Sequence, residues 1–255
     1  MAKRVQEFLI KENLKLNSEI CILELHTSDP LPEILPGQFT QVRIDGNSNV
    51  FLRRPFSFHD VDYKNNTVKL LVQVIGNGTK QLYYMTEGTN LNLLYPLGNS
   101  FTIPAKKERV LLVGGGSGIA PLLLLAKKLN EKNIQPDILL GFRNKGRITG
   151  KKEFEKFGKL LLTTEDGSEG EKGYVTDHSV LKTSTFDSIY CCGPDPMMKA
   201  VASYARKHEI NCEVSLENLM GCGIGICLCC IAPTNSGNIC TCTDGPVFNI
   251  KNLKW

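Results

Sequence analysis

The chain has 255 residues, 42% of them hydrophobic and 22% charged, so it is long enough for one large domain or two modest ones with ordinary cores. Its 30 basic and 26 acidic residues give a net charge of +4, too small to indicate nucleic acid as the main partner. No apolar run approaches the roughly 20 residues that cross a bilayer, and residues 1–16 lack a signal-peptide pattern, so we expect a cytoplasmic protein.

Residues 1–104 contain short apolar segments separated by turn residues. Four segments have the alternation and β-branched content of strands, namely residues 19–25, 39–44, 67–75 and 90–95. Pairs such as Pro36-Gly37 and Asp45-Gly46 supply turns between them. This half of the chain therefore reads as a barrel or a sandwich.

Two stretches of this half have unusual polar residues. Residues 52–58 read LRRPFSF, in which an arginine could bind phosphate through two hydrogen bonds. Residues 76–85 read GNGTKQLYYM, in which two glycines and a threonine precede a short helix and could hold an anion. A charged edge strand and a hairpin turn are the plainer interpretations.

Residues 109–216 alternate strands with helices, which indicates a parallel α/β sheet. Residues 110–121, VLLVGGGSGIAP, place a glycine loop between a buried strand and a helix. Residues 191–198, CCGPDPMM, end a second strand. Ligands of open α/β sheets bind at the carboxyl ends of strands, so these two loops could flank a dinucleotide. Each loop taken alone could also be a tight strand-to-helix turn.

Residues 217–255 hold six of the ten cysteines and have little apolar periodicity, so this segment is expected to need a metal to fold. Cys222, Cys227 and Cys230 have the C-x4-C-x2-C spacing of a plant-type [2Fe–2S] site. Zinc sites usually show paired C-x2-C motifs, and disulfides are rare in a reducing cytoplasm. The spacing leaves Cys229 as a spectator. The fourth ligand is Cys240 or Cys242, which share a face in an extended segment, so local geometry does not choose between them.

The order RPFS, GT, LLVGGGSGIAP and CGPDPMM resembles the ferredoxin–NADP reductase superfamily. The sequences ENLMGCGIGICLCC and CTDGPVF resemble the iron–sulfur, electron-transfer subunits of two-subunit, NAD-linked dihydroorotate dehydrogenases. The resemblance covers the whole chain and implies three domains. These are an antiparallel β-barrel that binds FAD (1–104), an α/β domain that binds NAD (105–216) and a small [2Fe–2S] domain (217–255).

The resemblance also implies which residues bind each cofactor. The FAD residues would be Arg54, Pro55, Phe56, Ser57, Leu71, Val72, Gln73, Gly78 and Thr79. The NAD residues would be Gly114, Gly115, Gly116, Ser117, Gly118, Cys192 and Gly193. The cluster ligands would be Cys222, Cys227, Cys230 and Cys242, since the family places its fourth ligand one residue before D-G-P. Gln73 departs from the family, where a basic residue is expected, which puts one contact to the FAD phosphates in doubt.

The implied function is electron transfer in de novo pyrimidine biosynthesis. Electrons would run from the FMN of a catalytic dihydroorotate dehydrogenase subunit through [2Fe–2S] and FAD to NAD⁺. The two subunits would form a heterotetramer with two copies of each, and no residue for the pyrimidine chemistry itself is expected in this chain. The alternatives are a reductase subunit of a sulfide dehydrogenase or an electron-bifurcating transhydrogenase, and a non-catalytic zinc protein.

Overall fold

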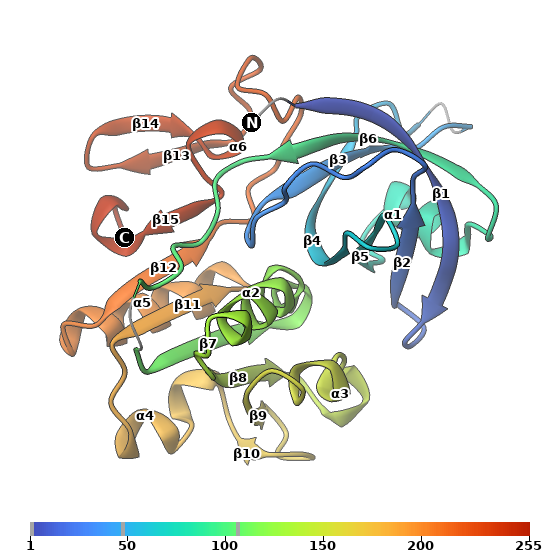
Figure 1. Ribbon diagram of the computed structural model, residues 1–255. Coiled ribbons are helices and arrows are strands. Elements are labelled where there is room, and N and C mark those ends of the chain that lie inside the picture. The colour runs from blue at the N-terminus through green and yellow to red at the C-terminus, as the bar shows by residue number, and fades with distance from the viewer. Residues whose placement is uncertain (1–2, 47–48, 106–107) are drawn as a thin grey trace. The chain divides into compact units, whose positions relative to one another are not determined.

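A computed structural model describes residues 3–46, 49–105 and 108–255 (Figure 1). The chain divides into two compact units. The first contains residues 1–100, 218–232 and 238–246, and the second contains residues 101–217, 233–237 and 247–255. The three cofactor-binding domains expected for residues 1–104, 105–216 and 217–255 remain a prediction. None of the helices in the described part of the chain is long and apolar enough to cross a membrane.

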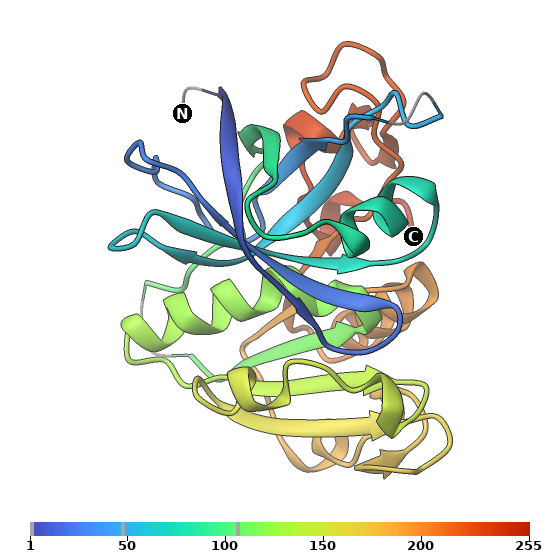
Figure 2. The same ribbon diagram turned by 90° about the vertical axis from the view of Figure 1, so that its right-hand side faces the viewer.

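The first unit contains a closed antiparallel barrel with the strand order β1-β2-β5-β4-β3-β6 (Figure 2). Its strands are β1 (Arg4–Lys15), β2 (Ile20–His26), β3 (Phe39–Arg43), β4 (Arg54–Asp62), β5 (Thr67–Gln73) and β6 (Asn90–Leu97). Closure pairs every strand edge. Phe8, Phe58 and Tyr95 fill the interior, with edge-to-face ring centroids 5.2 and 6.1 Å apart. One short helix, α1 (Asn77–Tyr84), follows β5.

The second unit contains a sheet with the strand order β10-β9-β8-β7-β11-β12-β15, parallel except for the last strand. Its strands are β7 (Val110–Gly115), β8 (Asp137–Phe142), β9 (Lys159–Thr164), β10 (Glu171–Lys172), β11 (Ser188–Cys192), β12 (Asn211–Ser215) and β15 (Val247–Asn249). Its α-helices are α2 (Ala120–Glu131), α3 (Lys151–Phe154), α4 (Val180–Thr183) and α5 (Asp195–Lys207). Both α2 and α5 begin with a proline in the first turn, where a missing N–H does no harm.

The cysteine-rich segment lies between β12 and β15. After an irregular loop it forms a two-stranded sheet, β13 (Ile231–Thr234) and β14 (Gly237–Cys240), and then a single helical turn, α6 (Thr241–Asp244). The predicted fold class, a barrel followed by a parallel α/β region, is confirmed. The pattern did not indicate strand β1. Strand β4 begins within residues 52–58, for which a charged edge strand was the plainer interpretation, but in the closed barrel it pairs on both sides. Helix α1 begins at Asn77, so Gly78 and Thr79 lie inside its first turn and do not precede it.

Candidate functional site

Backbone N–H groups surround the sulfur of Cys222. The N–H groups of Ile224, Ile226 and Cys227 lie 3.4, 3.3 and 3.5 Å from this Sγ atom and donate to it. Burial acts to raise the pKa of Cys222, but these donors outweigh it and lower that pKa to about 6. The loop therefore favours the thiolate, the form of cysteine that binds metal.

The other three predicted cluster ligands also accept a backbone N–H each. Cys222 N donates to Cys227 Sγ at 3.4 Å, Cys242 N to Cys230 Sγ at 3.4 Å, and Gly225 N to Cys242 Sγ at 3.2 Å. Within residues 3–46, 49–105 and 108–255, no backbone N–H donates to the sulfur of Cys229 or Cys240. This pattern separates the four predicted ligands from the two other cysteines of the segment.

The predicted ligands also interact with one another through their side chains. The side chains of Cys222 and Cys227 interact, and so do those of Cys230 and Cys242. Burial and then the Cys230 side chain raise the pKa of Cys242 to about 12. Cys230 also interacts with Cys240, so geometry alone still leaves two candidates for the fourth ligand.

A [2Fe–2S] cluster takes two thiolates on each iron, and a set of four cysteines supplies that number. Among the described residues, no three His, Cys, Asp or Glu side chains converge to hold a single metal ion. The backbone donors add to the fit, because N–H groups aimed at sulfur stabilise the negative charge of a thiolate-bound cluster.

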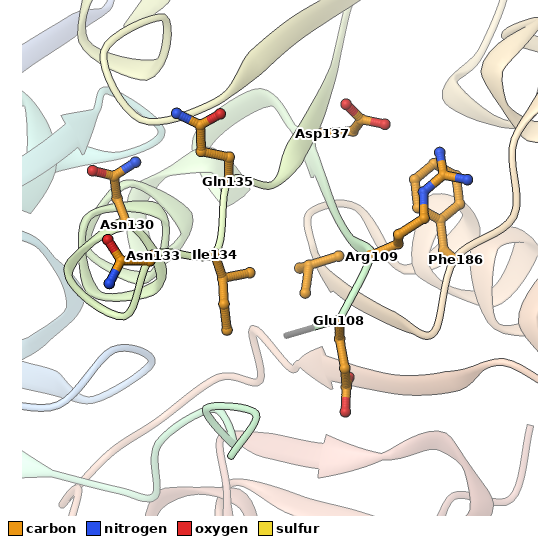
Figure 3. Close-up of a pocket in the computed structure, with 9 residues that line it drawn as sticks. Glu108, Arg109, Asn130, Asn133, Ile134, Gln135, Asp137 and Phe186 are labelled. Atoms are coloured by element: carbon orange, nitrogen blue, oxygen red, sulfur yellow. The ribbon is translucent and has the colours of Figure 1, made fainter. Parts of the chain in front are cut away.

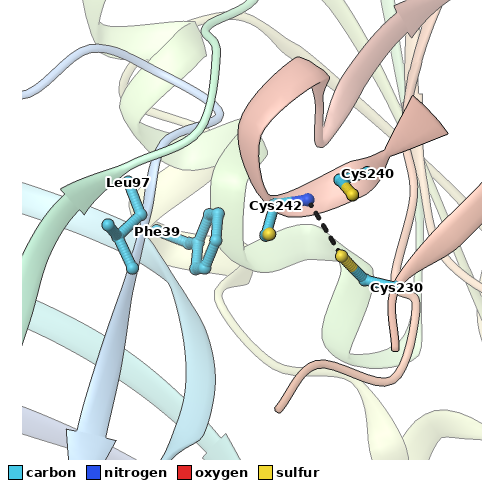
Figure 4. Close-up of a cluster of buried hydrophobic side chains, with 5 residues drawn as sticks. All are labelled: Phe39, Leu97, Cys230, Cys240 and Cys242. Carbon is cyan, nitrogen blue, oxygen red and sulfur yellow. Dashed lines mark hydrogen bonds between the residues drawn. The ribbon is translucent and has the colours of Figure 1, made fainter. Parts of the chain in front are cut away.

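The cysteine segment packs onto the barrel. Phe39 of β3 and Leu97 of β6 form one buried cluster with Cys230, Cys240 and Cys242 (Figure 4). The loop that carries Cys222 turns at Gly223, whose φ of +73° is in the left-handed region. A Cβ on Gly223 would lie 2.7 Å from Cγ of the barrel residue Gln41, so only glycine fits there.

The predicted FAD segments are brought together in the barrel unit. Residues 54–57 begin β4, and residues 71–73 end the neighbouring strand β5. A Cβ on Gly78 would lie 3.0 Å from Nε of Arg54, so the arginine rests directly against the first turn of α1. The first N–H groups of a helix have no partner within it, so the guanidinium and the helix start form one cationic, N–H-rich corner.

The hydroxyl of Thr79 is used inside its own turn. It accepts the N–H groups of Ile75 and Gly76 at 2.9 and 3.1 Å and donates to the carbonyl of Gly76 at 3.1 Å. A hydroxyl has one donor and two acceptor positions, so these three bonds saturate it. Thr79 therefore shapes the turn, and only its backbone is left for a phosphate.

The two adjacent arginines have different partners. Arg53 donates to the carbonyls of Gln41 in β3 and Asn92 in β6 at 3.1 and 3.0 Å, so it ties the start of β4 to both of these strands. Arg54 donates to the carbonyl of Leu52 within its own loop. The residue pattern alone did not separate the two, because the difference depends on which strands lie beside them; only the family resemblance selected Arg54.

The two predicted NAD loops touch each other at the carboxyl ends of the adjacent strands β7 and β11. A Cβ on Gly118 would lie 2.4 Å from the Cα and N atoms of Gly193, and one on Gly115 would lie 2.5 Å from Sδ of Met197. Beneath them Cys192 is buried, and burial raises the pKa of its thiol. The glycines thus allow backbone to pack on backbone, and this leaves the loop N–H groups at the sheet edge.

Sequence reasoning missed two further loops at this edge, which follow β8 and β9. They are joined because Lys145 N donates to Ser168 Oγ at 2.8 Å, and that hydroxyl donates to Asp166 at 2.6 Å. The sequence did contain a signal for these two loops, because each is a charged segment that directly follows a buried strand.

The α/β unit also has a cavity of about 480 Å³ at its opposite edge, by the amino ends of β7 and β8 (Figure 3). Its lining includes Arg109, Asn130 and Asp137, with the Arg109 guanidinium 5.6 Å from the ring centroid of Phe186. None of the residues predicted to bind a cofactor lines it.

Two protein families match parts of the chain. Residues 217–254 match the iron–sulfur cluster binding domain of dihydroorotate dehydrogenase B, and residues 112–203 match the oxidoreductase NAD-binding domain.

Curated relatives match nearly the whole chain. The dihydroorotate dehydrogenase B (NAD(+)) electron transfer subunit of Caldanaerobacter subterraneus is 41% identical over 243 residues, 94% of each chain. The subunit of the same name from Fusobacterium nucleatum is 36% identical over 256 residues, 96% of each chain.

Among solved structures, one described as an NADH-dependent reduced ferredoxin–NADP oxidoreductase is similar, with a TM-score of 0.89 and 31% identity over 97% of this chain and 90% of that one. The cytochrome b5 reductase domain of Ulva prolifera nitrate reductase shares the fold, with a TM-score of 0.68 at 16% identity over 81% of this chain and 94% of that one.

Proposed function

The chain belongs to the family of electron transfer subunits of dihydroorotate dehydrogenase B, and from this premise we propose that it passes electrons from the FMN of a catalytic partner through [2Fe–2S] and FAD to NAD⁺. The observation that carries the proposal is the cysteine loop, in which the sulfurs of the four predicted ligands each accept at least one backbone N–H group. The reaction would serve de novo pyrimidine biosynthesis in the cytoplasm.

Each cofactor has a set of residues in this chain. The cluster would be held by Cys222, Cys227, Cys230 and Cys242. FAD would lie along residues 54–57 and 71–73, with its phosphates at the corner formed by Arg54, Gly78 and the backbone of Thr79. NAD would meet residues 114–118 and 192–193 at the carboxyl edge of the α/β sheet.

The combination of cofactors follows from the electrons each can carry. Nicotinamide accepts a hydride, an iron–sulfur cluster carries one electron, and a flavin exchanges one or two, so the flavin stands between the other two. Oxidation of dihydroorotate to orotate releases two electrons and two protons. NAD⁺ takes up two electrons and one proton, so one proton is released to solvent.

An apolar rim on the cysteine loop supports a protein partner there. Leu219, Ile226 and Leu228 are 85%, 75% and 60% exposed, and Cys227 lies between the last two. Leu228 has a φ of +55°, which is rare for a residue with a side chain and holds it at the tip of the loop. We propose that the FMN-containing subunit covers this rim, in a heterotetramer with two copies of each chain.

A second candidate is a reductase subunit of an electron-bifurcating transhydrogenase or a sulfide dehydrogenase. The observation that favours it is the 0.89 TM-score to the bifurcating oxidoreductase structure at 31% identity. A structural zinc protein is disfavoured, because residues 217–254 match an iron–sulfur domain.

Purification of the chain alone and with a dihydroorotate dehydrogenase catalytic subunit tests the proposal. The chain alone should contain FAD and two irons and should reduce artificial acceptors with NADH, but it should not oxidise dihydroorotate. Adding the partner should produce NADH from dihydroorotate and NAD⁺. Pyrimidine turnover by the chain alone, or a stable complex that produces no NADH, would contradict it.

A further inference from the structure

Gln41 carries a buried side-chain amide. It lies in the middle of β3 with none of its surface exposed. Among the residues that the structure describes, neither Nε2 nor Oε1 of Gln41 has a hydrogen-bond partner. Native proteins rarely leave a buried amide unsatisfied, because it lost its water on folding and received nothing in exchange.

Other polar side chains beside it are bonded. Gln38 donates from Nε2 to the carbonyl of Gly98 at 3.0 Å and accepts the N–H of Leu35 at 2.9 Å. Thr40 donates to the carbonyl of Leu94 at 3.1 Å. Among the buried side chains in the described part of the barrel unit, Gln41 is the one that leaves both of its polar atoms without a partner, and it is also the one that meets the cysteine loop.

The surroundings of Gln41 place its amide against that loop. Alternate residues of a strand share a face, so Gln41 points to the same side as Phe39, which packs against Cys242. A Cβ on Gly223 would lie 2.7 Å from Cγ and 3.1 Å from Nε2 of Gln41, and 3.1 Å from Leu97. The amide thus lies against the residue that follows Cys222, inside the same compact unit.

We propose that Gln41 donates a hydrogen bond from Nε2 to a sulfur of the [2Fe–2S] cluster and thereby raises the reduction potential of the cluster. The inference rests on the proposed function, which places the cluster among these cysteines. An amide is not a ligand for iron, but it can donate to a sulfur. Reduction adds one negative charge to the cluster, and a donor stabilises the reduced form more than the oxidised form.

A redox titration of the holoprotein, followed by electron paramagnetic resonance, tests the inference. Gln41→Met keeps the length of the side chain and removes the donor. We expect it to retain two irons per chain and to lower the midpoint potential by the equivalent of about tenfold in the one-electron equilibrium, or about 59 mV. Gln38→Met is the matched control, expected to lower the melting temperature and leave the cluster potential unchanged.

The outcomes separate the inference from the function on which it rests. A wild-type chain without the spectrum of a reduced [2Fe–2S] cluster would reject the proposed function. A Gln41→Met chain with full iron and an unchanged cluster potential would reject the role of Gln41. A shift in the FAD potential alone would assign the amide to the flavin and overturn the inference.

A second measurement covers the case in which Gln41→Met does not hold the cluster. In the wild-type chain with ¹⁵N in its glutamine side chains, pulsed resonance of the reduced cluster should detect a coupled ¹⁵N nucleus and an exchangeable proton. Gln38, the other buried glutamine near the loop, already donates to Gly98. Absence of any coupled side-chain ¹⁵N would overturn the inference without a variant.

Discussion

The cysteine loop and the two predicted NAD loops are all rich in glycine, but their glycines have different structural roles. In the cysteine loop, Gly223 and Gly225 have φ values of +73° and +84°, and the turns they permit aim N–H groups at sulfur. In the predicted NAD loops, Gly118 leaves room for the backbone of Gly193, and Gly115 leaves room for the side chain of Met197. The cysteine loop would bind its cluster through side chains that the backbone orients, whereas the predicted NAD loops would present the backbone itself. Substitutions should therefore act locally in the first and through packing in the second.

The largest effect is expected from the cluster ligands. Cys242→Ala removes one of the four thiolates, so this variant should lose most of its iron and the visible absorption of the cluster. It should keep FAD, because the residues predicted to bind FAD lie elsewhere, in the barrel. Cys240→Ala and Cys229→Ala should keep both cofactors, since no backbone N–H in the described residues prepares their sulfurs as ligands. Iron analysis and absorption spectra of the three variants check this.

Cys240 could replace Cys242, because both interact with Cys230. The double variant Cys240→Ala/Cys242→Ala shows whether such a rescue occurs. If Cys240→Ala alone empties the site and Cys242→Ala leaves it full, the fourth ligand is Cys240.

Gly118→Ala should be next in size and should act on the other cofactor. Its Cβ would lie 2.4 Å from backbone atoms of Gly193, so one loop must move by a sizeable fraction of an ångström. A displacement near 1 Å costs on the order of 100-fold, and we expect that loss in NADH-dependent reduction of artificial acceptors. Gly116→Ala, whose Cβ would meet nothing within 4 Å, isolates the strain of its positive φ and should lose less. Equal losses in the two variants would mean that backbone packing is not the constraint.

Arg54→Ala should weaken FAD binding and spare the cluster. Losing a charge-assisted hydrogen bond costs about 1.5–3 kcal/mol, which is about tenfold to a hundredfold in affinity. Flavin content after dilution and gel filtration measures this. Arg53→Ala is the matched neighbour, because its guanidinium is engaged with Gln41 and Asn92. It should lower the melting temperature more than Arg54→Ala does, and the reverse order would contradict the assignment.

The smallest effect is expected on the pH dependence of stability, and it concerns the α/β unit. Burial lowers the pKa of His178, in the α/β unit, below its ordinary value of 6.5, against the pull of Glu171. Below about pH 6.5 the unfolded chain binds a proton that the folded chain does not, so stability is lost as the pH falls. His178→Gln should flatten the fall in melting temperature between pH 7.5 and 5.5, measured by circular dichroism. An unchanged slope would mean that other groups control it.

The sequence was sufficient for the parts of the molecule that depend on local pattern. Alternation and turn residues predicted a barrel or a sandwich, and the family resemblance selected the barrel, which is confirmed. The alternation of strands with helices predicted the α/β sheet, which is also confirmed. The cofactor residues remain predictions, although residues 54–57 and 78–79 and the two nucleotide loops each come together as expected. The different partners of Arg53 and Arg54 could not be predicted, because they depend on pairing with distant strands. The environment of Gln41 could not be predicted either, because the cysteine loop that packs against it is distant in the sequence.

The pairing of β12 with β15 has a consequence for how the cluster segment could be inherited or removed. Ser215 lies opposite Val247 in this antiparallel pair, so residues 216–246 leave and re-enter the sheet at one point. The segment is topologically an insertion in a hairpin, and its two ends are already held together. Replacing it with a short turn would preserve every strand of the α/β sheet and yield a reductase with only a flavin and a nicotinamide site. Conversely, a gene encoding such a simpler reductase could have acquired its iron–sulfur module in one step, without disturbing the fold around it.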